Sequence, residues 1–320
     1  MTTSWTQSQA GAYRRLAHDF AGRSGAAILF KGEGPNVLFE RNIYMKTQLT
    51  PFVKWAGGKS QLLGELKARI PADFNRYFEP FVGGGAMLFA TQPSNAVIND
   101  INGQLLNVYR RLKTDPDGVI DALKRYDAEE CSKERYFNLR TRYNEKIAAG
   151  ENDVECASLF IWLNKHCFNG LYRVNSKGFF NVPYNNKTTG ASADYDNLAA
   201  IGKYLSESDI DIRQGDFAKA CEDASAGDFV YFDSPYLPVS ATANFVEYAK
   251  DGFGMEDHKR LAELAKALSD KGVKVLLSNN DVPLVYELYA GFKIDKINVR
   301  RSINRDATKR TGCEVLIYNY

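Results

Sequence analysis

A short aromatic segment that leads directly into three glycines constrains the fold of this chain more than any other feature. Residues 77–82 are apolar enough for a buried strand, glycines follow at residues 83–85, and residues 86–90 are typical of a helix. Strand, glycine turn and helix in this order form the ligand-binding unit of nucleotide-binding α/β folds, where glycine lets the backbone approach a ligand closely. The segment therefore predicts an α/β sheet with a ligand at its carboxyl edge.

More strand-like segments fit the same sheet, at residues 96–98, 210–212, 229–232 and 273–277. Asp100 follows the first of them, at the strand end where an acidic side chain accepts the ribose hydroxyls of an adenosine. A hydride-transferring enzyme would use the same combination. The glycines and Asp100 therefore predict an adenosine-bearing cofactor and leave the reaction open.

The stretch from Gly103 to Tyr184 has a different pattern, because its apolar residues recur at helical spacing. We therefore expect an α/β fold in which a Rossmann-like sheet is split by an inserted, mainly helical domain. The expected boundaries are residues 45–102 and 190–320 for the sheet domain and residues 103–189 for the insertion. Residues 1–44 show no clear period and are expected to form an N-terminal appendage, which is a disordered tail, a short helix near residues 10–20, or sequence upstream of the true start.

Composition and charge narrow the kind of partner. The formal net charge is +2, no apolar stretch approaches the roughly 20 residues of a membrane span, and the N-terminus lacks a signal-peptide pattern. We therefore expect a cytoplasmic protein with no membrane partner. The five cysteines form no CxxC pair, so neither a disulfide framework nor a metal site is expected. The densest basic run is either a solvated loop or a loop that contacts phosphates, and it comprises Arg300, Arg301, Arg305, Lys309 and Arg310.

The triplet Gly58-Lys59-Ser60 suggests a phosphate loop, but its surroundings exclude one. A phosphate loop would need glycine in place of Val53 and a strand before it. Lys59 could instead meet the carboxylate of an amino-acid-bearing cofactor, with Trp55 packed beside it. A plain turn with a core tryptophan is an equally good interpretation of these residues alone.

The sequence Asp233-Ser234-Pro235-Tyr236 directly follows the strand predicted at residues 229–232. Proline just after a strand fixes the turn, so the Asp233 carboxylate, the Ser234 carbonyl and the Tyr236 ring are expected near one spot. A carboxylate and a carbonyl can accept both hydrogens of a planar amine while an aromatic ring stacks on it, which leaves the nitrogen lone pair free to attack a methyl donor. The alternative is an ordinary strand-end turn with a buried tyrosine.

Five sequence blocks occur in a fixed order between Pro51 and the end of the chain. They are KWAGGK at residues 54–59, FEPFVGGGA at 78–86, NDIN at 99–102, FNGLYRVNSKGFFNVPY at 168–184 and FDSPYLPVSATANF at 232–245. With these blocks the chain resembles the Dam-type DNA adenine methyltransferases, which methylate adenine in GATC. The resemblance implies a Rossmann-like methyltransferase sheet and a helical insertion that recognises the DNA target.

The resemblance also implies which residues bind the cofactor and the DNA. The methyl donor would be S-adenosylmethionine, bound by Trp55, Lys59, Phe81, Gly83, Gly85, Asp100 and Asp233. Double-stranded DNA would be bound by Lys54, Phe168, Asn169, Leu171, Arg173, Pro183 and Arg301. In such enzymes Lys54 reads a base, Phe168 wedges into the base stack, Asn169 and Leu171 engage the target step, and Arg173 reads a guanine edge. An arginine suits guanine because its guanidinium bonds two acceptors at once. The chain is expected to act as a monomer.

One position departs from the family, whose catalytic motif is Asp-Pro-Pro-Tyr. Ser234 replaces the first proline, which keeps the carbonyl acceptor but loses the rigid ring, so we expect a slower enzyme. The expected reaction is direct transfer to the amino group of a flipped adenine. Its catalytic residues would be Asp233, Ser234, Pro235 and Tyr236, with no covalent enzyme intermediate.

Three other interpretations stay open at the level of sequence. A cytosine-N4 methyltransferase could use a similar turn, although Asp at the head of the motif favours adenine. A DNA-binding homologue could have lost catalysis through Ser234. A nicotinamide dehydrogenase would need a proton donor at the sheet edge, and His18 and His166 are expected elsewhere.

Overall fold

The computed structural model describes residues 29–31, 38–40, 48–59, 62–239, 252–300 and 311–320. The chain divides into two compact units, Met1–Gln48 and Leu49–Tyr320. In the first unit the described residues form an antiparallel pair, β1 (Leu29–Lys31) with β2 (Leu38–Glu40). The helix expected near residues 10–20 lies outside the described residues.

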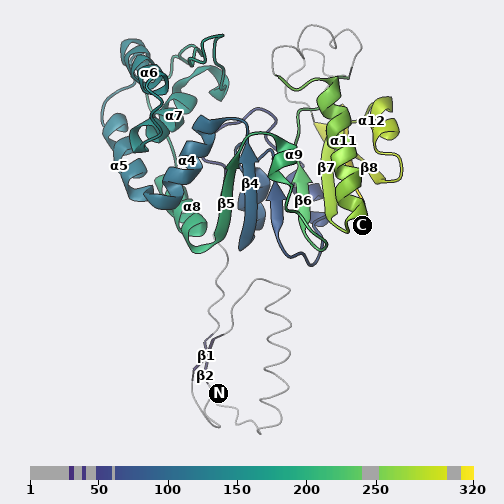
Figure 1. Ribbon diagram of the computed structural model, residues 1–320. Coiled ribbons are helices and arrows are strands. Elements are labelled where there is room, and N and C mark those ends of the chain that lie inside the picture. Colours follow the sequence, from purple (N-terminus) through teal and green to yellow (C-terminus); the bar gives the residue numbers. More distant parts are fainter. Residues whose placement is uncertain (1–28, 32–37, 41–47, 60–61, 240–251, 301–310) are drawn as a thin grey trace. The chain divides into compact units, whose positions relative to one another are not determined.

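A mixed sheet forms the centre of the second unit (Figure 1). Among the described residues it has seven strands in the order β5-β4-β3-β6-β7-β9-β8. The parallel strands are β3 (Tyr77–Glu79), β4 (Asn95–Asp100), β5 (Asp209–Gln214), β6 (Phe229–Phe232) and β7 (Lys274–Asn280). Each coincides with a strand expected from the sequence, which confirms the α/β sheet.

The far side of the sheet differs from the expectation. β8 (Lys293–Arg300) pairs antiparallel with β9 (Thr311–Tyr318), which inserts antiparallel between β7 and β8. The sequence analysis did not anticipate this pair. β8 is an edge strand with charged residues on both faces and no buried side chain among those described, so it lacks the apolar pattern of a core strand.

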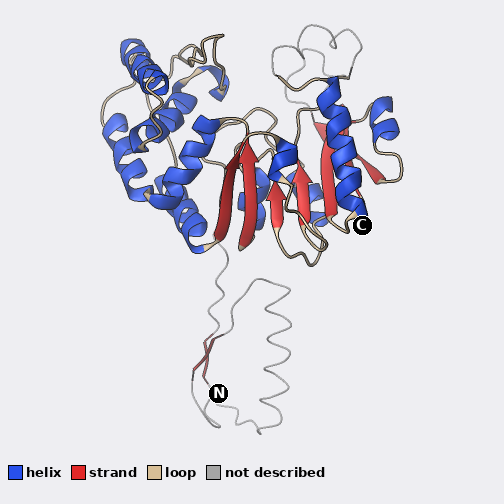
Figure 2. Cartoon of the chain, viewed as in Figure 1, coloured by secondary structure: helices blue, strands red, loops and turns tan. Residues whose placement is uncertain are grey.

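Helices lie on both faces of the sheet (Figure 2), and alternate strand residues belong to two different cores. Tyr77, Tyr231 and Leu276 belong to one core, which includes α2 (Leu63–Ala68) and α3 (Ala86–Thr91). Their neighbours Phe78, Val230 and Val275 belong to a second core. That core is covered by α9 (Phe217–Ala220), α11 (Met255–Asp270) and α12 (Pro283–Leu288). The sheet is therefore buried on both faces, as a parallel sheet requires.

The remaining helices gather beside the β5 edge of the sheet (Figure 1). They are α4 (Gly103–Thr114), α5 (Pro116–Asp127), α6 (Lys133–Ala148), α7 (Val154–His166) and α8 (Tyr195–Glu207). Helix α7 is buried on nearly all sides, because α4, α5 and α6 all pack on it. Its apolar residues join the same core as the first face of the sheet. The helices therefore have a rigid connection to the strands.

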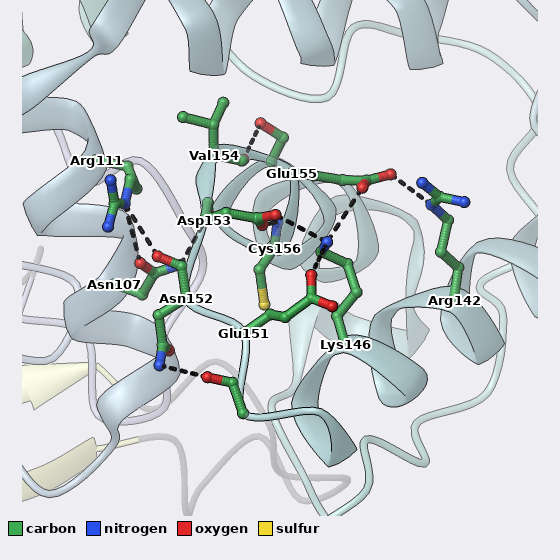
Figure 3. A network of polar contacts seen from close by, with 12 residues as sticks. Asn107, Arg111, Arg142, Lys146, Glu151, Asn152, Asp153, Val154, Glu155 and Cys156 are labelled. Carbon is green, nitrogen blue, oxygen red and sulfur yellow. Dashed lines mark hydrogen bonds and ion pairs between the residues drawn. The ribbon is translucent and has the colours of Figure 1, made fainter.

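A polar network clamps the start of α7 to α6 and α4 (Figure 3). The Lys146 ammonium lies 2.8 Å from an Asp153 carboxylate oxygen and 3.2 Å from one of Glu155, and it also pairs with Glu151. Arg142 pairs with Glu155 and lowers the pKa of that carboxyl to about 2. The network joins three helices through ion pairs and hydrogen bonds, and we assign it to stability.

Candidate active site

The turn that follows β6, residues 233–237, brings a carboxylate to the carboxyl edge of the sheet. The four β6 residues before it are all buried. The Lys59 ammonium lies 2.6 Å from Asp233 Oδ1, and the Ser278 hydroxyl donates to the same oxygen at 3.4 Å. Burial raises the pKa of Asp233, and the Lys59 charge opposes this rise. Within the described part of the chain, Asp233 Oδ2 has no hydrogen-bond partner, so this oxygen can accept a hydrogen from a ligand.

Side chains from two neighbouring strands fix the rest of the β6 turn. The Leu237 N–H donates to Asn279 Oδ1 at 2.9 Å, and Asn280 Nδ2 donates to the Leu237 carbonyl at 2.6 Å. The Tyr236 hydroxyl donates to Glu314 Oε2 at 3.0 Å, and the Lys59 ammonium lies 4.7 Å from the centre of the Tyr236 ring. The aromatic ring is therefore held beside the carboxylate.

Ser234 and Pro235 complete this turn. Ser234 is buried, with 3% of its surface exposed, whereas Pro235 is exposed. The predicted catalytic residues Asp233, Ser234, Pro235 and Tyr236 thus form one short turn with a fixed carboxylate and a fixed ring.

The glycine turn after β3 meets Asp100 at the end of β4. Asp100 Oδ2 accepts the Gly83 N–H at 3.0 Å, and Oδ1 accepts the Asn102 N–H at 2.9 Å. Burial raises the pKa of Asp100 against these hydrogen bonds. Each carboxylate oxygen keeps a second lone pair, so Asp100 can still accept hydroxyl donors.

Trp55 explains why glycine is needed in this turn. Gly83 has φ +48°, and a Cβ there would lie 2.7 Å from Trp55 Cδ1. At Gly85, with φ +77°, a Cβ would lie 2.5 Å from the Tyr109 hydroxyl oxygen, and that hydroxyl donates to the Gly83 carbonyl at 2.9 Å. The structure thus brings together Trp55, Gly83, Gly85 and Asp100, four of the residues expected to bind the cofactor.

Phe81 lies on the other side of the glycine turn. Its ring stacks on Phe217 at a centroid distance of 5.3 Å and meets Phe232 and Phe253 edge-on at 6.4 and 5.8 Å. Phe81 remains partly exposed at the same edge of the sheet. It can therefore offer an apolar wall to a ligand.

A buried carboxyl, Glu79, links the glycine turn to the β6 turn. It ends β3, which lies between β4 and β6 in the sheet. The Tyr77 hydroxyl donates to Glu79 Oε2 at 2.8 Å. Burial raises the pKa of Glu79 to about 8, and the nearby charge of Asp233 contributes to the rise. Glu79 is therefore largely neutral at pH 7, which leaves Asp233 as the negative partner of Lys59.

The loop after α7, residues 167–185, carries most of the residues predicted to bind DNA. Its first turn, η1 (Phe168–Gly170), presents Phe168 with 51% and the following Leu171 with 42% of their surface exposed. Asn169 is exposed and adopts φ +56°, a left-handed conformation that asparagine tolerates. Exposed apolar side chains on a fixed loop are typical of a binding surface.

Other contacts shape this α7 loop. The Pro183 carbonyl accepts the Phe168 N–H at 2.8 Å, which closes the base of the loop. The Arg173 guanidinium donates to Asn181 Oδ1 at 2.8 Å and remains exposed. Lys54 is exposed. It lies next to Gly170, since a Cβ on Gly170 would lie 2.7 Å from the Lys54 Cβ. Arg301 and most of the C-terminal basic run lie outside the described residues.

The sequence model of the family described as D12 class N6 adenine-specific DNA methyltransferase matches residues 55–303. The chain belongs to this family. It is an adenine-specific DNA methyltransferase, as the sequence blocks predicted. The match favours adenine over the cytosine-N4 and dehydrogenase alternatives.

Similar proteins support the assignment over nearly the whole second unit. A type II methyltransferase of Lactococcus lactis subsp. cremoris is 43% identical over 276 residues, which cover 86% of this chain and 97% of that protein. A type II methyltransferase of Methanocaldococcus jannaschii is 39% identical over 291 residues, or 85% of this chain and 100% of that protein. The DNA adenine methylase of Escherichia coli strain K12 is 34% identical over 275 residues, or 84% of this chain and 94% of that protein.

The sequence analysis missed four residues at or near the site of the methyltransferase. Ile101, with 77% of its surface exposed directly after Asp100, and the buried Glu79 directly before Pro80 could have been noticed beside the motifs. Asn164 and Glu314 carry no local signal, because their hydrogen-bond partners lie 110 and 78 positions away.

Two further observations bear on the chemistry of the methyltransferase. In the described ranges, no three or more His, Cys, Asp or Glu side chains are grouped so that they could hold a metal ion. The helices of the same ranges include none that is both long and apolar enough to cross a membrane.

Proposed function

We propose that this methyltransferase transfers the methyl group of S-adenosylmethionine to N6 of adenine in GATC sites of double-stranded DNA. The observation that carries the proposal is the Asp233 carboxylate, with Oδ1 held by Lys59 and Oδ2 open beside the Tyr236 ring. We further propose that the target adenine leaves the base stack to reach this turn, because a paired adenine uses one amino hydrogen in the base pair and has both ring faces stacked. The enzyme would act as a monomer in the cytoplasm.

The chemistry of the glycine turn fits an adenosine-bearing methyl donor. Asp100 has lone pairs left for the ribose hydroxyls, and the exposed Ile101 and partly exposed Phe81 offer apolar surface to a purine ring. Trp55 lies against Gly83 and would border the same ligand. Gly85 would shape the turn beneath the donor. S-adenosylmethionine would supply an electrophilic methyl group on its sulfonium.

The residues of the β6 turn would orient and activate the amine. Asp233 Oδ2 and the Ser234 carbonyl would accept the two amino hydrogens, and the Tyr236 ring would stack on the base. Both hydrogens then lie in the plane of the base, and the lone pair points out of it toward the methyl group. Formation of the N–C bond would break the methyl–sulfur bond of the donor, which would leave as a neutral thioether, and one amino proton would then have to leave the nitrogen. The pKa of Asp233, which burial raises, suits this carboxylate to receive that proton.

The α7 loop supports the choice of target. Arg173 is exposed and already oriented by Asn181, which suits a bidentate contact with guanine, and Phe168 could fill the space of the displaced adenine. Lys54, Asn169, Leu171 and Pro183 line or border the same loop. The proposal of GATC as the target rests on the sequence of this loop, which resembles that of GATC-specific enzymes.

The experiment is transfer of a tritiated methyl group from S-adenosylmethionine to two duplexes of equal composition, one with GATC and one with the site scrambled. The account predicts label only in the GATC duplex, recovered as N6-methyladenine after digestion. Equal labelling of both duplexes would contradict GATC specificity. Label in cytosine, or absence of label despite DNA binding, would contradict the proposed reaction.

A further inference from the structure

One buried amide, that of Asn164, connects two segments with different proposed tasks. Asn164 lies near the end of α7 with 4% of its surface exposed. Its Oδ1 accepts the Lys54 N–H at 2.9 Å, and its Nδ2 donates to the Lys54 carbonyl at 3.0 Å. The same Nδ2 donates to the Gly170 carbonyl at 2.9 Å. The side chain thus uses three hydrogen bonds, all of them to backbone groups.

These backbone groups belong to the two ligand-facing segments. Lys54 is the first residue of the 54–59 segment. The next residue, Trp55, lies at the glycine turn, and the last residue, Lys59, forms an ion pair with Asp233. Gly170 lies between Asn169 and Leu171 in the α7 loop. A side chain could not replace the hydrogen of Gly170, because its φ is +66° and a Cβ would meet the Lys54 side chain at 2.7 Å. The two segments are therefore in direct contact at the point where Asn164 joins them.

An aromatic stack forms a second connection between the same segments. The Trp55 ring stacks on Tyr172 of the α7 loop at 5.7 Å and on Phe160 of α7 at 6.1 Å. Phe160 and Tyr172 stack on each other at 5.1 Å. A shift of the α7 loop would thus disturb Trp55 as well as Lys54. Packed side chains and hydrogen bonds of this kind can carry energetic coupling between sites.

We propose that Asn164 is a positioning residue that sets the α7 loop and the 54–59 segment in one register, so that cofactor binding and specific DNA binding each favour the other. The inference rests on the proposed function, since it assumes that these segments bind S-adenosylmethionine and DNA. Asn164 itself touches neither ligand, because its side chain is buried among backbone groups of the protein. Its effect passes through Lys54, Trp55 and Gly170.

Replacement of the Asn164 amide by a carboxylate tests the hydrogen bonds of this side chain while its size stays nearly the same. Asn164→Asp keeps the shape and the acceptor for the Lys54 N–H, but it removes the donor to two carbonyl oxygens and sets a negative charge against them. Asn164→Ser also removes the Gly170 hydrogen bond and adds no charge. The matched control is Asn107→Asp in α4. Asn107 is also buried, and its amide donates to the Asp153 carbonyl at 3.1 Å and accepts from Arg111, residues that belong to neither segment.

The experiment measures the Kd of a fluorescent GATC duplex by anisotropy, with and without saturating S-adenosylhomocysteine as an unreactive stand-in for the cofactor. In the wild type and in Asn107→Asp, S-adenosylhomocysteine should tighten GATC binding by at least about five-fold. In Asn164→Asp and Asn164→Ser this factor should fall to about one. Linkage requires the same factors for the effect of DNA on S-adenosylhomocysteine affinity, which calorimetry can check. Methylation rates at saturating and limiting DNA should show a raised KM in the Asn164 variants.

Each result bears on the proposal. A wild type that binds both ligands with no mutual effect overturns it, whatever the variants do. Asn164 variants that keep the wild-type factor also overturn it. Thermal unfolding identifies any variant that has lost its fold. The test of the proposal then uses the factor by which S-adenosylhomocysteine tightens DNA binding in the wild type and in the other Asn164 variant. A wild type that does not bind S-adenosylhomocysteine or does not methylate GATC contradicts the proposed function instead.

Discussion

The β6 turn and the α7 loop hold their functional residues in different ways. In the β6 turn, side chains are held by other side chains: Lys59 fixes Asp233, and Glu314 fixes Tyr236. In the α7 loop, most contacts fix the backbone and leave the side chains exposed. Asn144 pairs with both backbone groups of Phe180, and the Tyr136 hydroxyl donates to the Val182 carbonyl at 2.8 Å.

This difference matches the tasks proposed for the two regions. Methyl transfer needs a carboxylate and a ring in one geometry, since small displacements cost rate. Recognition of a duplex needs a loop of fixed shape whose side chains can still reach base edges. Arg173 is the intermediate case, because Asn181 orients its guanidinium while the side chain stays exposed. Variants in each region should therefore fail in different measurements.

The largest effect is expected at the β6 turn. Asp233→Ala removes the acceptor of the amino hydrogen and leaves the buried Lys59 ammonium without its partner. We expect single-turnover methylation to fall by about 10²- to 10³-fold or more. The Kd for a GATC duplex, measured by anisotropy without cofactor, should change little, because no described hydrogen bond joins this turn to the α7 loop.

Asp233→Ala that retains the wild-type rate would contradict the assigned role of this turn. Loss of DNA binding in the same variant would contradict the separation of tasks between the two regions.

The next effect is expected in the α7 loop. Arg173→Ala removes the guanidinium proposed to read guanine, so discrimination between GATC and a site with that guanine changed should fall by about 5- to 150-fold. The measurement is kcat/KM on the two duplexes. Lys177→Ala is the control, because Lys177 is exposed in the same loop and has no assigned base contact. A uniform loss on both duplexes would reassign Arg173 to phosphate binding.

The next prediction concerns the buried carboxyl of Glu79 and the cost of ionising it next to the β6 turn. Burial raises its pKa to about 8 from 4.5, so the folded protein keeps a proton that the unfolded chain releases in this range. Stability from the neutral carboxyl is complete below about pH 4.5 and is lost as the pH rises through about 8.

Glu79→Gln keeps a neutral group and should remove that loss. The free energy of unfolding in urea should be compared between the variant and the wild type at two pH values. The difference in favour of the variant should be larger at pH 8 than at pH 5 by at least about 1 kcal/mol. A difference that does not change between these two pH values would show that Glu79 ionises freely in the folded protein.

The smallest effect is expected from Ser234→Pro. The proline ring would restrict the backbone at this buried position. The reduced backbone entropy is worth about 0.4 to 1 kcal/mol, which corresponds to roughly a two- to five-fold higher turnover. Affinity for S-adenosylmethionine, measured by calorimetry, should stay the same. Unchanged turnover would mean that the serine turn is already as rigid as the reaction requires.

The sequence predicted the parts of the molecule whose signals are local. Residues 77–82, Asp100 and Asp233 stood out because a strand end is marked by its own neighbours along the chain. Their convergence followed from the rule that parallel strands bring their carboxyl ends to one edge. The same reasoning cannot pair Lys59 with Asp233 or Asn164 with Lys54, because distant pairs depend on how helices pack on the sheet. The β8 and β9 pair was missed for two reasons. The edge strand β8 has only weak apolar patterning, and the apolar run of the inner strand β9, with buried Val315, Leu316 and Ile317, was not assigned to the sheet.

The most direct test is single-molecule mapping of modified bases in DNA from cells that lack other adenine methylation and express either the wild type or Asp233→Ala. The account predicts N6-methyladenine at GATC on both strands with the wild type and a strongly reduced methylated fraction with the variant. N6-methyladenine at another sequence would contradict the GATC assignment. Methylated cytosine, or adenine methylation that stays at the wild-type level in Asp233→Ala, would contradict the proposed chemistry of the β6 turn.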